Sequence, residues 1–530
     1  MNEARRQAYL NLIRSLENCP KGKERQILLD NIELLDSGLL QVFLEKKRHQ
    51  AYLNLIRSLL DCPNGEESQI LQENSELVDA ELVYVMLKEA NNLRTYNNLD
   101  EANSIMTMAG YLLGIYSDTM IHKLSPSAYR KFLTEVLQAS ANSNGNTHVI
   151  YPLLATDLKL VNDNLAVVLQ NWVRETLPNL DSPKKRIDII ACVVNLSLAI
   201  AEFPLGSIAS NLEIAIAGYE IALRVLTHQE SAQNWATVQN NLGLAYSNRI
   251  RGEKAENIEN AISSFQVALS VFTREAFHEN WAATQNNLGR AYRNRIRGEK
   301  ADNLETSIAI YQESLEIYTR KAFPQDWAWT QSLLATAYLN RIRGEKAENI
   351  ETAIAFYQKS LEIHTREAFP QNWANTQSNL AAAYSDRIRG EKAENIEIAI
   401  ALYQQLLEIH TREAFPQDWA DTQNSLAGAY VKRIRGEKAD NLEMAIALYQ
   451  TSLEVCTREA FRFKWAMIQM NLSATYSQRI RGEKADNLET AIALCQKSLE
   501  VCTREAFPFE WAMIQSHLAS RHLQNSNIMW

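Results

Sequence analysis

An internal repeat with a period of 46 residues constrains this chain more than any other feature. Tryptophan recurs at this interval at positions 235, 281, 327, 373, 419, 465 and 511. The hexamer RIRGEK recurs at the same interval, beginning at positions 249, 295, 341, 387, 433 and 479. Repeats of this length are single supersecondary units that bury their apolar side against their neighbours, so the units must stack into an array.

Each unit reads as two helices joined by a tight turn. In the unit that begins at Trp373, apolar residues at helical spacing run to Ile388, a turn follows at Gly390, and a second apolar stripe runs from Ile396 to Ile409. The chain has only 17 glycines and 11 prolines in 530 residues, less than half of their usual share. A chain this poor in turn residues is not a sandwich or a barrel, and we predict an all-α fold.

The repeats divide the chain into three parts. Residues 211–228 align with 257–274, so a degenerate unit precedes the first complete one. The sequence AYLNLIRSL occurs at 8–16 and again at 51–59, which indicates a duplicated module. We predict duplicated helical modules at 1–117, a helical connector at 118–185 and a solenoid at 186–530. The solenoid comprises the degenerate unit 186–234, six full units over 235–510 and a terminal half unit at 511–530.

Residues inside one unit carry a family resemblance. In the unit that begins at Trp281, Leu288, Gly289 and Tyr292 on the first helix resemble the motif of the tetratricopeptide repeat, as do Tyr311 and Ser314 on the second. The usual repeat has 34 residues, and the 12 additional residues lengthen both helices. This long form is similar to the repeats of kinesin light chains. The resemblance implies a right-handed, tetratricopeptide-like α-solenoid.

Several segments outside this motif resemble one larger architecture. They are AYLNLIRSLLDCPNGEE at 51–67, FPLGSIASNLEIAIAGYE at 203–220 and the recurring REAFPQDWA. Together they are similar to cyanobacterial tetratricopeptide proteins that often end in a CHAT domain, a caspase-like cysteine protease. Only 19 residues follow Trp511, and they contain no such domain. The resemblance therefore implies an adaptor for a protease or signalling protein supplied by a separate chain, and no protease activity of its own.

Charge and composition exclude several function classes. The net charge of −9 argues against nucleic acid as a partner, because binding to phosphates requires a basic surface. No stretch reaches 18 apolar residues and the amino terminus is charged, so we expect neither a membrane span nor a signal peptide. The six cysteines form no CxxC pair. We expect a cytoplasmic protein.

Comparison of the units separates structural from variable positions, which we number as offsets from the tryptophan of each unit. We interpret the tryptophan as a helix-packing residue and the RIRGEK charges as ion pairs between neighbouring repeats. Offset 37 carries Phe272, Tyr318, His364, His410, Cys456 and Cys502. Equivalent atoms of stacked helices lie about 10 Å apart, so we expect half-buried packing here and no metal. No catalytic motif or cofactor motif is present, and we predict no enzyme activity.

Offsets 2, 5, 9, 12 and 13 vary among the units and lie on one face of the first helix. By the family resemblance this face lines the concave groove of the superhelix. Its asparagines can bind a peptide backbone, and its tryptophan and methionines are poor choices for a face in water. We predict that a protein or peptide partner binds to Asn240, Asn286, Arg290, Arg293, Trp329, Asn375, Asp421, Asn424, Met467 and Met470. Trp329→Ala and Met470→Glu should then weaken binding without lowering thermal stability.

Two alternatives stay open. The first is that the variable face is simply exposed to solvent, because positions that face solvent can also differ between the units. The second alternative is a self-assembling structural protein, with a homo-oligomer formed through the amino-terminal modules or through the open carboxyl end. At that end, Ile528, Met529 and Trp530 form an apolar tip, whereas His517 and Arg521 supply part of a polar cap.

Overall fold

The computed structural model describes residues 37–61, 67–74, 126–412, 415–458, 461–504 and 507–529, with isolated positions between 12 and 86. Every regular element in these ranges is a helix. The chain forms two compact units. The first comprises Met1–Lys123 with Pro152–Asp157, and the second comprises Leu124–Tyr151 with Leu158–Trp530.

In the first unit the described helices are α3 (Ser37–Asp61) and α4 (Glu67–Glu73), which contact each other. The second copy of the duplicated sequence lies in α3, where Tyr52, Leu55, Ile56 and Leu59 are buried. The first copy lies almost wholly outside the described residues. The duplicated module therefore stays a prediction.

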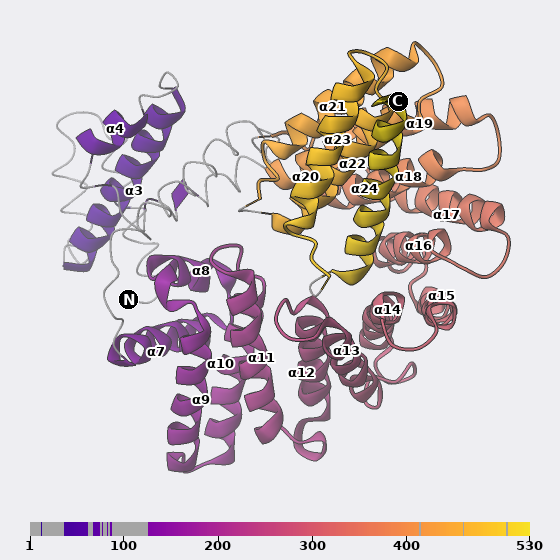
Figure 1. Cartoon of the computed structure of the whole chain (residues 1–530). Helices are drawn as coiled ribbons and strands as arrows, with labels where there is room; N and C mark the ends of the chain where they lie inside the picture. Colours follow the sequence, from indigo (N-terminus) through magenta and orange to yellow (C-terminus); the bar gives the residue numbers. More distant parts are fainter. Residues whose placement is uncertain are drawn as a thin grey trace. The chain divides into compact units, whose positions relative to one another are not determined.

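The second unit is a stack of antiparallel helix pairs (Figure 1). The pairs are α10 (Pro183–Ala201) with α11 (Ile208–Val225), α12 (His228–Asn248) with α13 (Lys254–Leu269), α14 (His278–Asn294) with α15 (Lys300–Ile317), α16 (Pro324–Leu339) with α17 (Lys346–Leu361), α18 (Pro370–Asp386) with α19 (Lys392–Leu407), α20 (Pro416–Lys432) with α21 (Lys438–Leu453), and α22 (Arg462–Gln478) with α23 (Lys484–Leu499). The single helix α24 (Pro508–Met529) follows. The predicted all-α solenoid, with one hairpin per 46 residues, is confirmed.

Two of the helices before the repeats, α7 (Pro126–Ser143) and α9 (Asp163–Thr176), pack onto the first hairpin. Along the chain, α8 (Thr147–Thr156) and the short helix η3 (Leu158–Leu160) lie between them, and the short helix η4 (Leu177–Asn179) follows α9. The helix α7 contacts α10, and α9 contacts α11. The predicted division into modules, connector and solenoid stays a prediction, but these two helices share a compact unit with the repeats.

Small residues on the first helix let the second helix approach closely. A typical buried cluster combines Ala374 and Ala381 of α18 with Ile396, Ile400 and Tyr403 of α19. At Gly289 a side chain would not fit, because an added Cβ would lie 2.6 Å from a ring carbon of Tyr311. Gly289 therefore makes room for the aromatic residue of its own hairpin.

The turn between the two helices is held by a buried asparagine. Gly390 adopts a left-handed φ of +78°, which costs a residue with a Cβ more than it costs glycine. Asn395 is buried; its Nδ2 donates to the carbonyl of Arg389 at 2.8 Å, and its Oδ1 accepts from Arg387 at 3.4 Å. Equivalent asparagines donate to the equivalent carbonyl in all six turns. The RIRGEK hexamer and the asparagine that follows it therefore encode one turn conformation.

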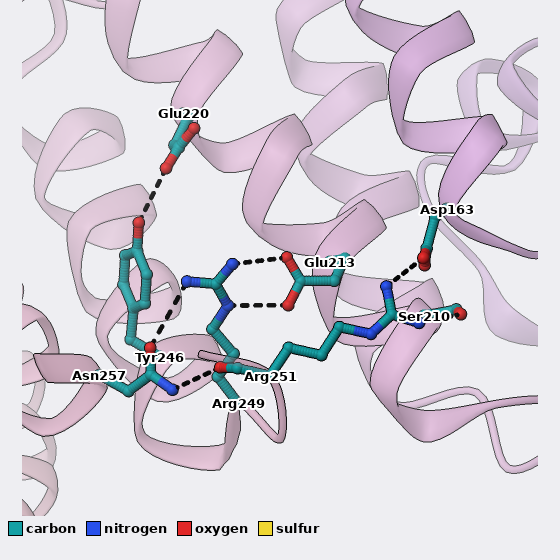
Figure 2. A network of polar contacts seen from close by, with 8 residues as sticks. All are labelled: Asp163, Ser210, Glu213, Glu220, Tyr246, Arg249, Arg251 and Asn257. Carbon is teal, nitrogen blue, oxygen red and sulfur yellow. Dashed lines mark hydrogen bonds and ion pairs between the residues drawn. The ribbon is translucent and has the colours of Figure 1, made fainter. Parts of the chain in front are cut away.

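The arginine that begins RIRGEK also joins each unit to the one before it. Arg387 donates from Nε and Nη2 to the two carboxylate oxygens of Glu351, both at 2.8 Å. These side chains are only 27% and 24% exposed, and the guanidinium also lies over the ring of Tyr384. Figure 2 shows the first such pair, Arg249 with Glu213. The same pair recurs at every junction between full units, so the predicted ladder of ion pairs is confirmed.

The recurring tryptophans pack at the same junctions. Trp373 and Trp419 border buried clusters, and each has an arginine of the preceding hairpin over its ring, Arg366 and Arg412 respectively. The prediction that this residue packs helices is confirmed.

We expect Arg341→Ala to lower the free energy of unfolding by roughly 1–3 kcal/mol, because it removes two charge-assisted hydrogen bonds to Glu305. Arg343→Ala in the same turn is the matched control. Its partner Asp302 is more than half exposed, so the loss should be within about 1 kcal/mol. Thermal unfolding followed by circular dichroism measures both. Equal losses would contradict the special role of the bidentate pair.

The same pair predicts how stability depends on pH. The hydrogen bond from Arg341 lowers the pKa of Glu305 below its ordinary value. A carboxyl group with a lowered folded pKa stabilises the protein fully above its unfolded pKa, and this contribution is lost as the pH falls through the folded value. The unfolding temperature should therefore drop below about pH 4.5. Arg341→Ala should show a smaller drop than the unmodified chain.

Candidate partner-binding face

The first helices of the repeats form the inner side of the solenoid. Consecutive first helices contact one another directly, from α12 with α14 through to α22 with α24, whereas consecutive second helices approach one another less closely. Because the first helices are spaced more closely than the second helices, the stack curves toward the row of first helices. Figure 1 shows α14 and α16 on the inner side of α15 and α17.

Four of the predicted binding residues have free side chains on this inner side. Trp329 on α16 is 38% exposed, and Asn375 on α18 is exposed. Arg290 and Arg293 on α14 are half-buried. None of these four side chains forms a hydrogen bond or an ion pair within the described residues. They occupy three consecutive first helices, α14, α16 and α18, and we call them the free inner cluster.

Four other predicted residues are used to join neighbouring first helices. Asn286 is buried and donates to Thr330 Oγ1 at 2.7 Å. Asn240 accepts a hydrogen bond from Asn287 at 3.1 Å, and Asn424 accepts one from Asn471 at 3.3 Å. Asp421 pairs with Lys464 at 2.6 Å. Their polar groups therefore stabilise the stack before any partner arrives.

The expectation that Met470 lies on the open face is wrong. Met470 is only 7% exposed and belongs to a buried cluster with Cys495, Cys502 and Ile514. Offset 5 faces the next first helix, here α24, so its side chain fills an interhelical contact. Met467 is half-buried and packs against the same cluster.

Two exposed aromatic residues were missed by the sequence interpretation. Phe463 is 38% exposed and Phe509 is 75% exposed. Both lie at offset −2, one turn before offset 2 on the same helical face, where four of the other units have glutamine. The replacement of glutamine by phenylalanine in the last two units is a signal that the sequence comparison could have used.

The column at offset 37 is fully buried, not half-buried as expected. His364 packs against Phe369, and burial lowers the pKa of His364. His410 lies against Phe415, and burial also lowers the pKa of its imidazole. Among the described residues, no three histidine, cysteine, aspartate or glutamate side chains gather as metal ligands do. The column fills the core.

A small pocket of about 280 Å³ lies where α9 meets α11 and α12. Its charged groups are paired with one another (Figure 2): Arg249 with Glu213, Arg251 with Asp163, and Tyr246 Oη donating to Glu220 at 2.8 Å. In later units the position equivalent to Ser210 carries an aspartate or glutamate that pairs with the second arginine of RIRGEK, as Asp302 does with Arg343 and Glu348 with Arg389. The degenerate unit has Ser210 there, and Asp163 of α9 supplies the carboxylate instead. These contacts fix α9 to the repeats and leave no charge free for a ligand.

Comparison with known proteins identifies the repeat type. Residues 281–320 match the family model described as tetratricopeptide repeat. The other full units share the leucine at offset 7 and the tyrosine at offset 11 with the matched unit, and each forms the same helical hairpin. No curated protein gives a significant match to the chain.

Solved structures resemble the chain only distantly. The Rap conjugation gene regulator of plasmid pLS20, in complex with the Phr* peptide, has 14% sequence identity and a TM-score of 0.39, covering 71% of this chain and 96% of that chain. The apo quorum sensor NprR from B. thuringiensis has 16% identity and a TM-score of 0.42, covering 78% and 99% respectively. The Cut9–Hcn1 structure has 12% identity and a TM-score of 0.39, covering 91% and 94%. Likeness at this level does not extend to ligands.

In the part of the chain that the structure describes, no helix combines the length and the apolar character required to cross a bilayer.

We expect Met470→Glu to lower the free energy of unfolding by roughly 2–4 kcal/mol, because it places a carboxyl group in an apolar contact. Met470→Leu, the volume-matched control, should cost less than about 1.5 kcal/mol. Trp329→Ala should leave the melting temperature nearly unchanged, since that side chain is 38% exposed and is not part of the core cluster that α16 forms with its neighbours. Circular dichroism melting curves test all three. A large loss in Trp329→Ala would show that Trp329 is a core residue.

Proposed function

We propose that the solenoid is a non-enzymatic scaffold that binds a protein or peptide partner along its inner face. The free inner cluster carries this proposal, because its four side chains lie on three consecutive first helices and none of them has a hydrogen-bond or ion-pair partner within the described residues. Tryptophan and arginine are the residue types that contribute most to protein interfaces. Asparagine can both donate to and accept from a peptide backbone.

The exposed tryptophan favours binding over a merely solvated face. Among the first five full units, only the unit that begins at Trp327 has an aromatic residue at offset 2. The other four have a threonine, an alanine, an asparagine and an aspartate there. The indole of Trp329 is 38% exposed and fills no core cluster. Folding does not need an exposed indole at this position, because the other units form the same hairpin without one.

The inner face is also chemically graded along the solenoid. Near α14 it carries Arg290 and Arg293, whereas near α22 and α24 it carries Met467 and the exposed Phe463 and Phe509. A partner segment with a polar end and an apolar end would bind in only one direction. The architecture that the sequence resembles favours a protease or signalling protein on a separate chain as that partner.

Self-assembly is the second candidate function, and one observation favours it. The isoleucine of every RIRGEK turn is exposed, with exposures between 59% and 62%. The six residues are Ile250, Ile296, Ile342, Ile388, Ile434 and Ile480. They form one row, one residue per repeat, along the edge where the turns lie. A second copy of the chain could cover such a row.

Affinity capture from the native cell extract tests the scaffold proposal. The full chain and Met444→Ala should retain the same bound proteins, whereas Trp329→Ala with Asn375→Ala should lose at least one of them by tenfold or more. Met444 is a matched control, because it is an exposed apolar residue of the second helix α21. Identical capture by all three proteins would exclude the free inner cluster as the binding surface.

Light scattering coupled to size exclusion tests self-assembly. If the isoleucine row joins copies of the chain, the mass should fall on dilution, and Ile342→Ser with Ile388→Ser should give the monomer mass at concentrations where the unmodified chain is larger. A mass of 60.3 kDa for the unmodified chain at all concentrations would reject this function.

A further inference from the structure

Arg290 and Arg293 differ from the arginines that build the repeats. The arginine at offset 14 holds a carboxylate with two hydrogen bonds at every junction. Arg290 and Arg293, at offsets 9 and 12, have no carboxylate partner in the described structure. At these two offsets the other units carry small, hydroxyl or aliphatic residues. This pair of cations therefore belongs to one unit and is not required by the fold.

The two guanidinium groups lie close together and are partly removed from water. Residues three apart on a helix are neighbours on its surface, and both side chains are half-buried. Burial lowers the pKa of Arg290, and the positive charge of Arg293 lowers it further. Lys300 adds a third cation: burial and Arg293 lower the pKa of its ammonium group. Among the described residues, no carboxylate pairs with Arg290 or Arg293 to offset this repulsion, and Lys300 donates to the backbone carbonyl of Arg293.

The same unit also gives up a buried hydrogen bond. In the next unit, the buried Tyr357 hydroxyl pairs with Thr336 Oγ1 at 2.9 Å. Arg290 stands at the offset of Thr336, and Tyr311 stands at that of Tyr357. The buried hydroxyl of Tyr311 therefore lacks the partner that Tyr357 has, and Ser307 of its own helix is the hydroxyl nearest in role to that partner. Replacing a hydroxyl by a guanidinium thus costs this unit charge balance and the hydrogen bond between its two helices.

A local cost that the fold does not require is typical of a functional site. We infer that Arg290 and Arg293 bind an oxyanion, a carboxylate or a phosphate group, carried by the peptide segment that occupies the inner face. This inference rests on the proposed function, and it names the chemistry of the partner. Guanidinium groups bind both oxyanions through paired, charge-assisted hydrogen bonds. The partner segment would therefore be acidic or phosphorylated opposite α14.

The first test uses the full chain without any partner, with inorganic phosphate as the probe. In buffer of low ionic strength, R290T should raise the melting temperature, because it removes the repulsion and offers Tyr311 a hydroxyl. Phosphate should raise the melting temperature of the unmodified chain more than chloride at equal ionic strength, and R290T should abolish that difference. The control R297Q removes an exposed arginine of the adjacent turn and should keep the phosphate response. A lower melting temperature in R290T, with the phosphate response retained, would overturn the inference.

The second test separates the two sources of the oxyanion. Fluorescence polarisation would compare three short labelled peptides of one glycine–serine sequence, with a central Glu-Glu pair, a central phosphoserine or a central Gln-Gln pair. One of the two charged peptides should bind at least tenfold more tightly than the Gln-Gln peptide, and R290Q with R293Q should remove that preference. Equal binding of all three peptides would overturn the inference.

The capture experiment distinguishes failure of this inference from failure of the proposed function. If R290Q with R293Q keeps the captured partner while Trp329→Ala with Asn375→Ala loses it, the oxyanion site is wrong and the inner face still binds. If the partner is lost from both, and restored in R290K with R293K, the positive charge itself is required.

Discussion

The bidentate pair between an arginine of one turn and a glutamate of the preceding hairpin is the constraint on which the rest of the structure depends. Two parallel hydrogen bonds fix the guanidinium and the carboxylate in one plane, so Arg387 and Glu351 set the angle between their units and not only the distance. The buried Asn395 holds the turn that presents Arg387. In a solenoid each unit contacts only its neighbours. Repeating one junction six times therefore determines the whole array and leaves the inner face free to vary in composition.

Most of this architecture could be predicted from the sequence, because its determinants repeat at a fixed interval. The hairpins, the packing role of the tryptophan and the ion-pair ladder each depend on residues whose partners recur at constant separations. The attachment of α9 could not be predicted in this way. Asp163 lies outside the repeats and replaces a carboxylate that the degenerate unit has lost at Ser210. A single compensating contact of this kind leaves no periodic signal.

The candidate site was predicted less well, because variation along a column has two physical causes. Offset 2 varies where it faces solvent, as Trp329 and Asn375 do. Offset 5 varies although it is packed between first helices, because different pairs fill the same contact: Asn286 with Thr330, Ser332 with Thr376, and Met470 within an apolar cluster. Helical spacing puts both offsets on one face, but it does not say which edge of that face a neighbouring helix covers. The partner of each offset 5 residue lies in the next unit, about one repeat away in the sequence. Comparing such pairs of positions, instead of one offset at a time, would have separated packed positions from exposed ones.

A solenoid can hold an unbalanced pair of arginines that a compact globular core would tolerate poorly. Because energies are summed over units and their interfaces, the cost of Arg290 and Arg293 stays within one hairpin and its two junctions. That hairpin, α14 with α15, lies between complete units on both sides, and Arg295 and Arg341 each bind a glutamate across its boundaries. An end unit, with one neighbour, would open more readily under the same repulsion. Ion pairs on both sides of the hairpin therefore stabilise it against the repulsion between the two arginines. In this interior unit, both guanidinium groups can stay unpaired until an oxyanion binds.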